Sequence, residues 1–289
     1  MRRVEYDTHS HLLALQDLAA QNLSVVGPTS GPHPGDIAHW IHGALRAYDP
    51  VEVVPVWVDD RGVSAFGVLW PQYGGVDLCV RPDVGDAVYQ ELFRLLLDEA
   101  AKGDHVEVDL HDGDARGLAV AAELGFMKVR SVFAVNAQSL GPVQPIADSD
   151  YEIRCASYEE FAEIADVHRS AFGSTWTPDE YRRYMSTPAY APERELIAVA
   201  PDGSLAGFAV CWMDHLNGIG YFEPVGVHQD HHRKRVGSDL LAAGMNLMRD
   251  AGMRTATVLY DLENDGNARF YAENGFKRIE TVARYERTT

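Results

Sequence analysis

The 289-residue chain has few cysteines, no long hydrophobic run and a shortage of positive charge. Its three cysteines, Cys79, Cys155 and Cys211, are too few and too widely spaced for a disulfide framework or a zinc site. Each lies in an apolar, strand-like stretch, so we expect three buried free thiols. No segment approaches the roughly 18 apolar residues of a membrane span, and the N-terminus lacks the apolar core of a signal peptide. We therefore expect a soluble, cytoplasmic protein with no membrane partner.

Acidic residues outnumber basic ones throughout the chain. There are 43 Asp and Glu against 25 Lys and Arg, a formal net charge of −18, of which residues 1–150 carry −12 and residues 151–289 carry −6. Such a field repels nucleic acid phosphates and mildly favours cationic ligands. The hydrophobic content of 46% is typical of a globular protein. A chain about twice the common domain length has room for two domains.

Two halves of the chain repeat each other in the same order. Three pairs of segments match: DRGVSAFGVLW at 60–70 with DGSLAGFAVCW at 202–212, VRPD at 80–83 with VHQD at 227–230, and AELGF at 122–126 with AENGF at 272–276. Self-similarity that keeps its order predicts two copies of one domain. Pro142, Pro145 and the acidic stretch at 148–150 predict a linker between them. We expect domains at 1–141 and 151–289, joined by residues 142–150.

The second copy predicts a mixed sheet with helices on both faces. Strands are expected at 151–154, 195–200, 206–213, 221–227, 257–260 and 279–285, and helices at 159–172, 178–184, 237–250 and 267–273. Apolar periodicity, Thr177 before Pro178 as a helix start and Gly252 as a helix stop support this assignment. The order βααβββαβαβ is typical of an α/β fold. We therefore expect two tandem α/β domains.

A basic loop follows the strand expected at 221–227. Residues 231–237, HHRKRVG, lead into an amphipathic helix, which places Arg233, Lys234 and Arg235 beside unpaired backbone N–H groups and the positive end of a helix dipole. This arrangement suits a pyrophosphate. Taken alone, the loop is equally compatible with a solvated basic turn.

The strand EPVGV at 223–227, this loop and a later Asn264…Tyr271…Gly275-Phe276 pattern together resemble the acetyl-CoA site of the GNAT acetyltransferase superfamily. The resemblance covers residues 151–289 and, more faintly, 1–150. The chain is similar to tandem members of the family in which one copy is degenerate. It implies an acyl-CoA N-acyltransferase fold, acetyl-CoA as acyl donor and an amine acceptor. The cofactor-binding residues that it implies are Val225, Gly226, Val227, His232, Arg233, Lys234, Arg235, Val236, Gly237, Ser238 and Asn264.

The loop departs from the family pattern at one position. That pattern is Arg or Gln, two residues, Gly, one residue, and Gly or Ala, and here Arg235 stands where the first glycine is expected. Glycine serves where backbone approaches phosphate closely or takes a positive φ. Arg235 therefore either adopts that conformation at a cost or turns its guanidinium onto the phosphates. Either outcome bears on cofactor affinity.

The first copy lacks the corresponding features. Only Val84, Gly85 and Asp86 separate Asp83 from a helix expected at 87–101, and no basic cluster is present beyond Arg81. Ala121 stands where the second copy has Tyr271. We expect the first copy to be a structural partner that binds no cofactor, because a short acidic loop repels a pyrophosphate.

In the resembled family the amine attacks the thioester directly, which calls for a base and for an acid that protonates the thiolate. Tyr271 matches the position of the family's acid, with core packing as its alternative role, for which its neighbour Phe270 is better placed. We predict Glu223 as the base, because a carboxyl in an apolar strand must be satisfied or functional. A structural Glu223 and His228 acting through water are the alternatives. Asn264 either hydrogen-bonds the pantetheine arm or caps a helix.

An acceptor pocket is expected between the first two helices of the second copy and the strands opposite the cofactor. The residues expected to line it are Trp176, Trp212, His215 and Tyr221. The twelve histidines show neither metal-ligand spacing nor a Ser/His/Asp triad. We therefore predict an N-acetyltransferase that uses acetyl-CoA, needs no metal and modifies a small-molecule or peptide amine in its C-terminal domain. The alternatives are a non-catalytic acyl-CoA-binding or regulatory protein and a purely structural tandem.

Overall fold

The computed structural model describes residues 1–100, 105–146 and 150–288. The chain forms two compact units. The first contains Met1–Asn136, Leu259–Phe270 and Lys277–Thr289, and the second contains Ala137–Val258 and Tyr271–Phe276. Among the helices of the described residues, none is long and apolar enough to cross a membrane.

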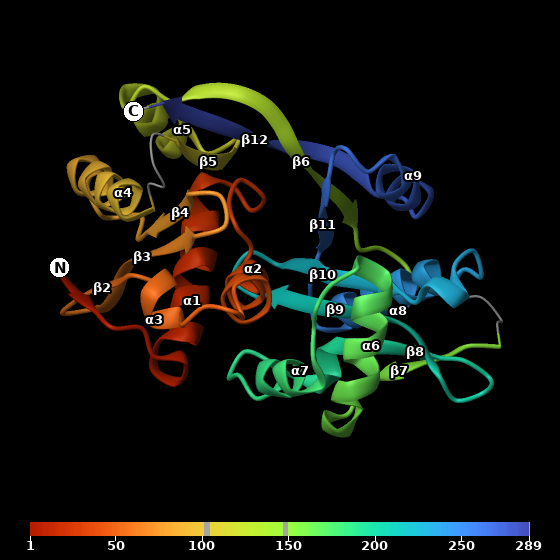
Figure 1. The fold of residues 1–289 in the computed structure, drawn as a ribbon. Helices are drawn as coiled ribbons and strands as arrows, with labels where there is room; N and C mark the ends of the chain where they lie inside the picture. The colour runs from red at the N-terminus through yellow and green to blue at the C-terminus, as the bar shows by residue number, and fades with distance from the viewer. Residues whose placement is uncertain (101–104, 147–149, 289) are drawn as a thin grey trace. The chain divides into compact units, whose positions relative to one another are not determined.

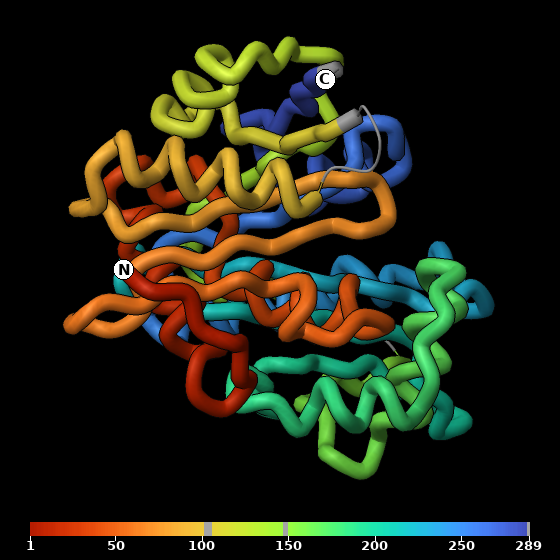
Figure 2. Tube along the Cα trace, turned by 60° about the vertical axis from the view of Figure 1, so that its left-hand side comes forward, coloured from red at the N-terminus to blue at the C-terminus, as the bar shows by residue number. Residues whose placement is uncertain are grey.

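The strands of the first unit lie in the order β1-β2-β3-β4-β5-β12-β6 (Figure 1). Its strands are β1 (Arg2–Val4), β2 (Val56–Asp59), β3 (Gly62–Trp70), β4 (Gly75–Val80), β5 (His105–His111), β6 (Met127–Ser139) and β12 (Lys277–Thr288). Its helices are α1 (Thr8–Val26), α2 (Pro34–His39) with a π-helical turn at Trp40–Ala44, α3 (Pro50–Val53), α4 (Asp86–Ala100) and α5 (Ala115–Glu123). Strands β2, β3 and β4 form an antiparallel meander, drawn in orange in Figure 2. Helices α1 and α4 both pack on β3 and β4.

The strands of the second unit lie in the order β11-β10-β9-β8-β7. Its strands are β7 (Glu152–Cys155), β8 (Glu195–Val199), β9 (Leu205–Asp214), β10 (Ile219–Val227) and β11 (Thr255–Asp261), of which the part from Leu259 onward belongs to the first unit. Its helices are α6 (Phe161–Phe172), α7 (Pro178–Met185) and α8 (Val236–Asp250), with 3-10 turns at Tyr158–Glu160, Pro192–Arg194 and Gln229–His231. Helix α9 (Asp265–Glu273) follows β11. The element order predicted from the sequence is confirmed, including Thr177 as the N-cap of α7, where its hydroxyl accepts a hydrogen bond from the Glu180 N–H.

Helix α8 lies close against β9 and β10 because a glycine faces them. A Cβ atom built on Gly244 would come within 2.3 Å of the Phe222 ring and 2.9 Å of the Cys211 sulfur. Any larger residue would push the helix off the sheet. Gly252, with φ of +87°, then ends the helix, and its N–H bonds the Arg249 carbonyl at 2.9 Å. This packing fixes the N-terminus of α8 relative to the end of β10.

The last strand of the chain joins the first unit. β12 pairs with β5 in antiparallel register from Val282↔His111 to Thr288↔His105. Arg284 of β12 donates two hydrogen bonds to Asp109 of β5, at 2.9 and 2.8 Å. Residues 137–139 at the end of β6 belong in turn to the second unit. The compact units therefore do not follow the repeat boundary expected at 141–151, since each includes a strand segment from the other copy.

Two cysteines are buried as expected, and the third is not. Cys79 and Cys211 lie in the cores of the two units, whereas Cys155 is exposed. The prediction for Cys155 was wrong because β7 is the outermost strand of its sheet, and only a strand covered on both faces buries every side chain.

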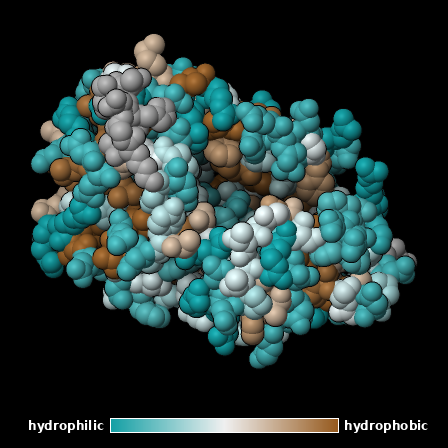
Figure 3. Space-filling view, viewed as in Figure 1, coloured by the Kyte–Doolittle hydropathy of each residue, from teal (hydrophilic) through white to brown (hydrophobic). Residues whose placement is uncertain are grey.

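Hydrophilic residues cover most of the face drawn in Figure 3, in keeping with the acidic composition. Residues 147–149 of the expected linker and the expected helix end at 101 lie outside the described residues.

Candidate active site

Strands β10 and β11 diverge in the middle of the second unit. They pair in parallel from Ile219↔Thr255 to Phe222↔Val258. Beyond Phe222, in the described part of the chain, β10 pairs only with β9, at Val225, Gly226 and Val227. One backbone edge of these three residues therefore faces the opening between the strands, where an extended ligand could add as a strand.

The loop after β10 presents backbone N–H groups at the start of α8. Arg235 is the N-cap residue of α8 and adopts a left-handed conformation with φ of +65°, and Arg233 has φ of +60°. Among the residues that the structure describes, no side chain caps this helix end. Because the first N–H groups of a helix have no intrahelical partner, those of Val236, Gly237 and Ser238 remain directed toward the loop. Of the two alternatives for Arg235, the structure has the positive φ.

The cations of this loop are exposed and unpaired. The side chains of Arg233, Lys234 and Arg235 are all exposed and, within the described residues, take part in no hydrogen bond or ion pair. The His232 side chain instead contacts the end of β10, where its Nε2 lies 3.1 Å from the Val227 carbonyl oxygen. Free cations beside free N–H groups form the donor set that a pyrophosphate requires. The loop thus fits the phosphates of acetyl-CoA.

Glu223 lies where β10 turns away from β11. Its side chain is half-buried, and the Tyr221 hydroxyl donates to its Oε2 over 3.4 Å. The Trp212 indole N–H donates to the Glu223 carbonyl oxygen at 2.8 Å, and Trp212 is the cross-strand partner of Tyr221. The Arg194 guanidinium lies over the Trp212 ring, 5.2 Å from its centroid. The structure thus brings together three sequence-predicted residues, Glu223, Tyr221 and Trp212.

Tyr271 is connected to the same strand through aromatic packing. It is 8% exposed, and its ring lies 5.9 Å from that of Phe276, which lies 6.3 Å from that of Phe222 on β10. Phe270 is only half-buried, so the expectation that it rather than Tyr271 would be the packed neighbour was wrong. The helix turns Tyr271 toward the sheet instead.

The remaining predicted residues lie in different places. The Asn264 side chain caps α9, accepting from the Asn267 N–H at 3.0 Å. Trp176 is 4% exposed and packs against His168, Tyr181 and Tyr184 between α6 and α7. His215 is exposed in the turn between β9 and β10, at the end of the sheet opposite the basic loop.

Sequence reasoning missed a buried carboxyl next to this region. Glu195 is fully buried and receives hydrogen bonds from the hydroxyls of Tyr181 and Tyr190, the latter at 2.6 Å. Burial raises the pKa of Glu195 to about 7, against the lowering effect of the two hydroxyls. The phenol oxygen of Tyr184 is also buried and hydrogen-bonded to no described residue. The available signal was Glu195 at the start of the apolar strand ELIAV, the same pattern that singled out Glu223.

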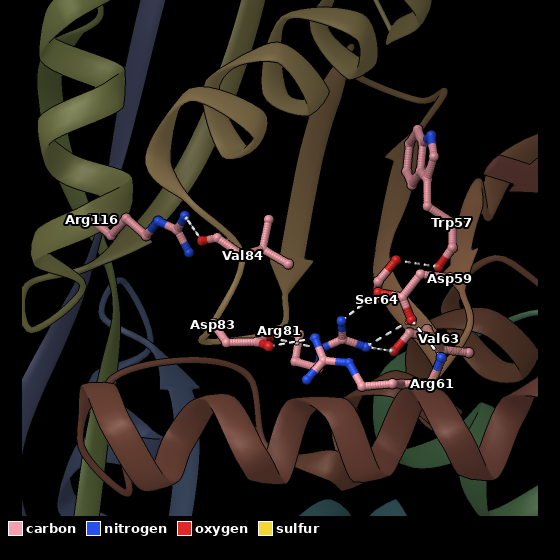
Figure 4. Close-up of polar contacts among 9 residues, drawn as sticks. All are labelled: Trp57, Asp59, Arg61, Val63, Ser64, Arg81, Asp83, Val84 and Arg116. Atoms are coloured by element: carbon pink, nitrogen blue, oxygen red, sulfur yellow. Dashed lines mark hydrogen bonds and ion pairs between the residues drawn. The ribbon is translucent and has the colours of Figure 1, made fainter. Parts of the chain in front are cut away.

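The corresponding loop of the first unit has its charges paired (Figure 4). Arg81 binds Asp59 and Asp83, with 2.7 Å between its Nε and Asp83 Oδ1, and Arg61 also pairs with Asp83. Arg81 lowers the pKa of Asp59 to about 2. Arg116 of α5 donates to the Val84 carbonyl oxygen at 2.6 Å. No cation named here is left unpaired for a phosphate.

The sequence and the fold resemble those of known proteins. Residues 161–276 match the model of the acetyltransferase (GNAT) family. The whole fold resembles a tandem GNAT protein from the clavulanic acid biosynthesis pathway, with a TM-score of 0.65, 16% identity and coverage of 99% of this chain and 98% of that one. It also resembles a GCN5-related N-acetyltransferase from Sphaerobacter thermophilus, with a TM-score of 0.60, 16% identity and coverage of 99% and 95%.

These matches and those that follow support a tandem GNAT-type N-acetyltransferase, which moves an acetyl group to an amine. The sequence of this chain is similar to mycothiol acetyltransferases of two organisms. That of Kineococcus radiotolerans is 29% identical over 259 residues, which cover 83% of each chain. That of Actinosynnema mirum is 28% identical over 223 residues, which cover 72% of this chain and 73% of its own. The alternative of a non-catalytic acyl-CoA-binding protein is not favoured. In the described residues, no group of His, Cys, Asp and Glu could hold a metal ion.

Proposed function

We propose that the second unit carries the reaction, with acetyl-CoA held between the diverging strands and the basic loop. Arg233, Lys234 and Arg235 would hold the phosphates together with the N–H groups at the start of α8. The open edge of β10 at 225–227 would bind the pantetheine arm as an added strand. The observation that supports this proposal is the unpaired charge of Arg233, Lys234 and Arg235. In the corresponding loop of the first unit, Arg81 is held in an ion pair.

Glu223 and Tyr271 would handle the two proton transfers. Bound acetyl-CoA supplies an acetyl group activated as a thioester. A bond forms between the amine nitrogen and the acetyl carbon while the carbon–sulfur bond breaks. Glu223 takes the proton lost by the amine, and the Tyr271 hydroxyl gives a proton to the thiolate sulfur. Tyr221, which donates to Glu223, would orient that carboxylate.

The acceptor would be a small-molecule amine. Glu223, Tyr221 and Trp212 form a polar and aromatic surface on β9 and β10, and the ring of Trp212 is backed by Arg194. A carboxylate beside aromatic rings suits a protonated amine before it loses its proton. Because two relatives are named for mycothiol, an amine of the mycothiol type is the first acceptor to test.

Calorimetric titration of acetyl-CoA and steady-state kinetics would test this function. We expect one acetyl-CoA site per chain, and Glu223→Gln should lower kcat/KM about 100-fold or more, as expected for loss of a general base. The exposed Glu273→Gln is the matched control and should leave the rate unchanged. Two sites would contradict a first unit without cofactor, and no binding at millimolar acetyl-CoA would overturn the proposal.

A further inference from the structure

The first unit encloses a cavity of about 320 Å³ where β4 and β5 diverge. In the described residues these strands pair in parallel only at Gly75↔Glu107. Tyr89 and Phe93 on α4 also line the cavity. Pockets of roughly 300–1,000 Å³ hold small ligands, so a compact molecule would fit here.

One wall of the cavity is aromatic. The rings of Trp40 and Trp70 meet edge to face with centroids 5.6 Å apart, and Tyr73 stacks on Trp70 at 5.9 Å. Aromatic faces attract cations and also pack against apolar groups. This wall therefore suits a ligand with a positive charge and an apolar body.

The other charged lining consists of four aspartates together with His111 and Arg284, and three of the four carboxylates already have partners. Asp36 caps α2 by accepting from the His33 N–H at 2.7 Å, and Asp114 caps α5 by accepting from the Gly117 N–H at 2.9 Å. Asp109 is paired with Arg284, the single Lys or Arg among the described lining residues. A structural role thus accounts for each of these carboxylates.

Asp77 has no such structural role. In the part of the chain that the structure describes, its one hydrogen bond comes from the Trp70 indole N–H at 2.5 Å, from within the aromatic wall. Burial raises the pKa of Asp77 to about 7, and the nearby charge of Asp109 adds to the effect. A positive group placed beside a buried carboxyl with a raised pKa stabilises its ionised form and so lowers that pKa.

The sheet register places Asp77 where the second unit has Glu223. Asp77 pairs with Val68, whose counterpart in the repeat is Val210. In β10 the bulge formed by Glu223 and Pro224 lies opposite Val210. Both units therefore carry a carboxyl at the same point of the same strand.

We propose that this cavity binds a small primary amine with an apolar body, its ammonium group beside Asp77 and its body against Trp40 and Trp70. The amine would be bound and not acetylated there. Ala121 offers no phenol group at the position that Tyr271 occupies, and the loop after β4 has its cations paired.

Titration of the full-length protein with benzylamine, followed by tryptophan fluorescence, would test the site. Benzyl alcohol is the uncharged comparison of the same shape. We expect benzylamine to change the fluorescence and to raise the thermal midpoint, since a ligand of the folded state stabilises it. Asp77→Asn should weaken benzylamine binding at least 10-fold, while Asp98→Asn, an exposed change of the same kind on α4, should not.

Glu223→Gln separates this cavity from the acceptor site of the second unit. The fluorescence titration should be the same in Glu223→Gln and in the unaltered protein. Circular dichroism and the thermal midpoint without ligand establish that Asp77→Asn is folded, as expected because an Asn amide oxygen can still accept from Trp70. Equal binding of benzyl alcohol and benzylamine would overturn the proposal. So would benzylamine binding that Glu223→Gln weakens and Asp77→Asn leaves unchanged.

Discussion

The loop after β4 and the loop after β10 occupy the same place in two copies of one fold, and they use their cations differently. Arg81 and Arg61 are bound by Asp59 and Asp83, whereas the cations at 233–235 have no partner in the described residues. Whether a cation can bind an anion thus depends on its neighbours as well as on its presence. The N-terminal loop contains arginine and still offers little to a phosphate.

The same contrast extends to the chemistry beside each loop. In each unit two parallel strands diverge, β4 and β5 in the first and β10 and β11 in the second. The earlier strand of each pair carries a carboxyl, Asp77 on β4 and Glu223 on β10. A tyrosine stands on the following helix only in the second unit, where the first has Ala121. The first unit therefore retains a pocket and has alanine at the position of this tyrosine, which is the pattern of a binding site without catalysis.

The largest expected effect comes from removing the Tyr271 hydroxyl, a group that the first unit lacks at this position because it has Ala121 there. Tyr271→Phe keeps the ring that packs on Phe276 and removes only the hydroxyl. We expect kcat to fall about 100- to 10,000-fold, the usual contribution of a general acid, with acetyl-CoA affinity nearly unchanged. Kinetics and calorimetry on the same preparation would measure both. An equal loss of rate and affinity would assign Tyr271 to the core instead.

A smaller effect is expected from single charges in the two loops. Lys234→Ala should weaken acetyl-CoA binding about 10-fold, or about 1.4 kcal/mol, and more at low salt than at high salt. Arg81→Ala is the matched change in the first unit. It should lower the thermal midpoint, because Asp59 loses its ion-pair partner and Asp83 keeps only Arg61, and it should leave acetyl-CoA affinity unchanged. If Arg81→Ala weakened acetyl-CoA binding as much as Lys234→Ala, the contrast between the loops would be lost.

The smallest effect concerns the residue that replaces a glycine. Arg235 holds φ of +65°, which costs a non-glycine residue about 1–2 kcal/mol. Arg235→Gly removes that cost but gives the unfolded chain about 0.4–1 kcal/mol of extra freedom. We expect a net stabilisation of about 0.5–1 kcal/mol in chemical denaturation. Lys234→Gly, at a position without a positive φ, should destabilise. Acetyl-CoA titration of Arg235→Gly then reports how much the guanidinium contributes.

Patterns spread along the chain predicted most of the fold and of the candidate site. Apolar periodicity and the Thr177 cap gave the element order of the second copy, since both signals are local. The basic loop and Glu223 were singled out because a charged group in apolar surroundings must either have a polar partner or serve a function. Trp212 and Tyr221 were named as lining residues and lie beside Glu223. Glu195 escaped notice because its two tyrosine partners approach from outside its own strand.

The sequence by itself determined the repeat, the element order and the two contrasting loops, because each depends on residues close together in the chain. Only the tertiary structure decided that β12 pairs with β5, which joins the end of the second copy to the first unit. Tertiary structure also decided that Arg81 is neutralised and that Asp77 faces a cavity. These outcomes depend on contacts between residues far apart in sequence, which local patterns do not encode.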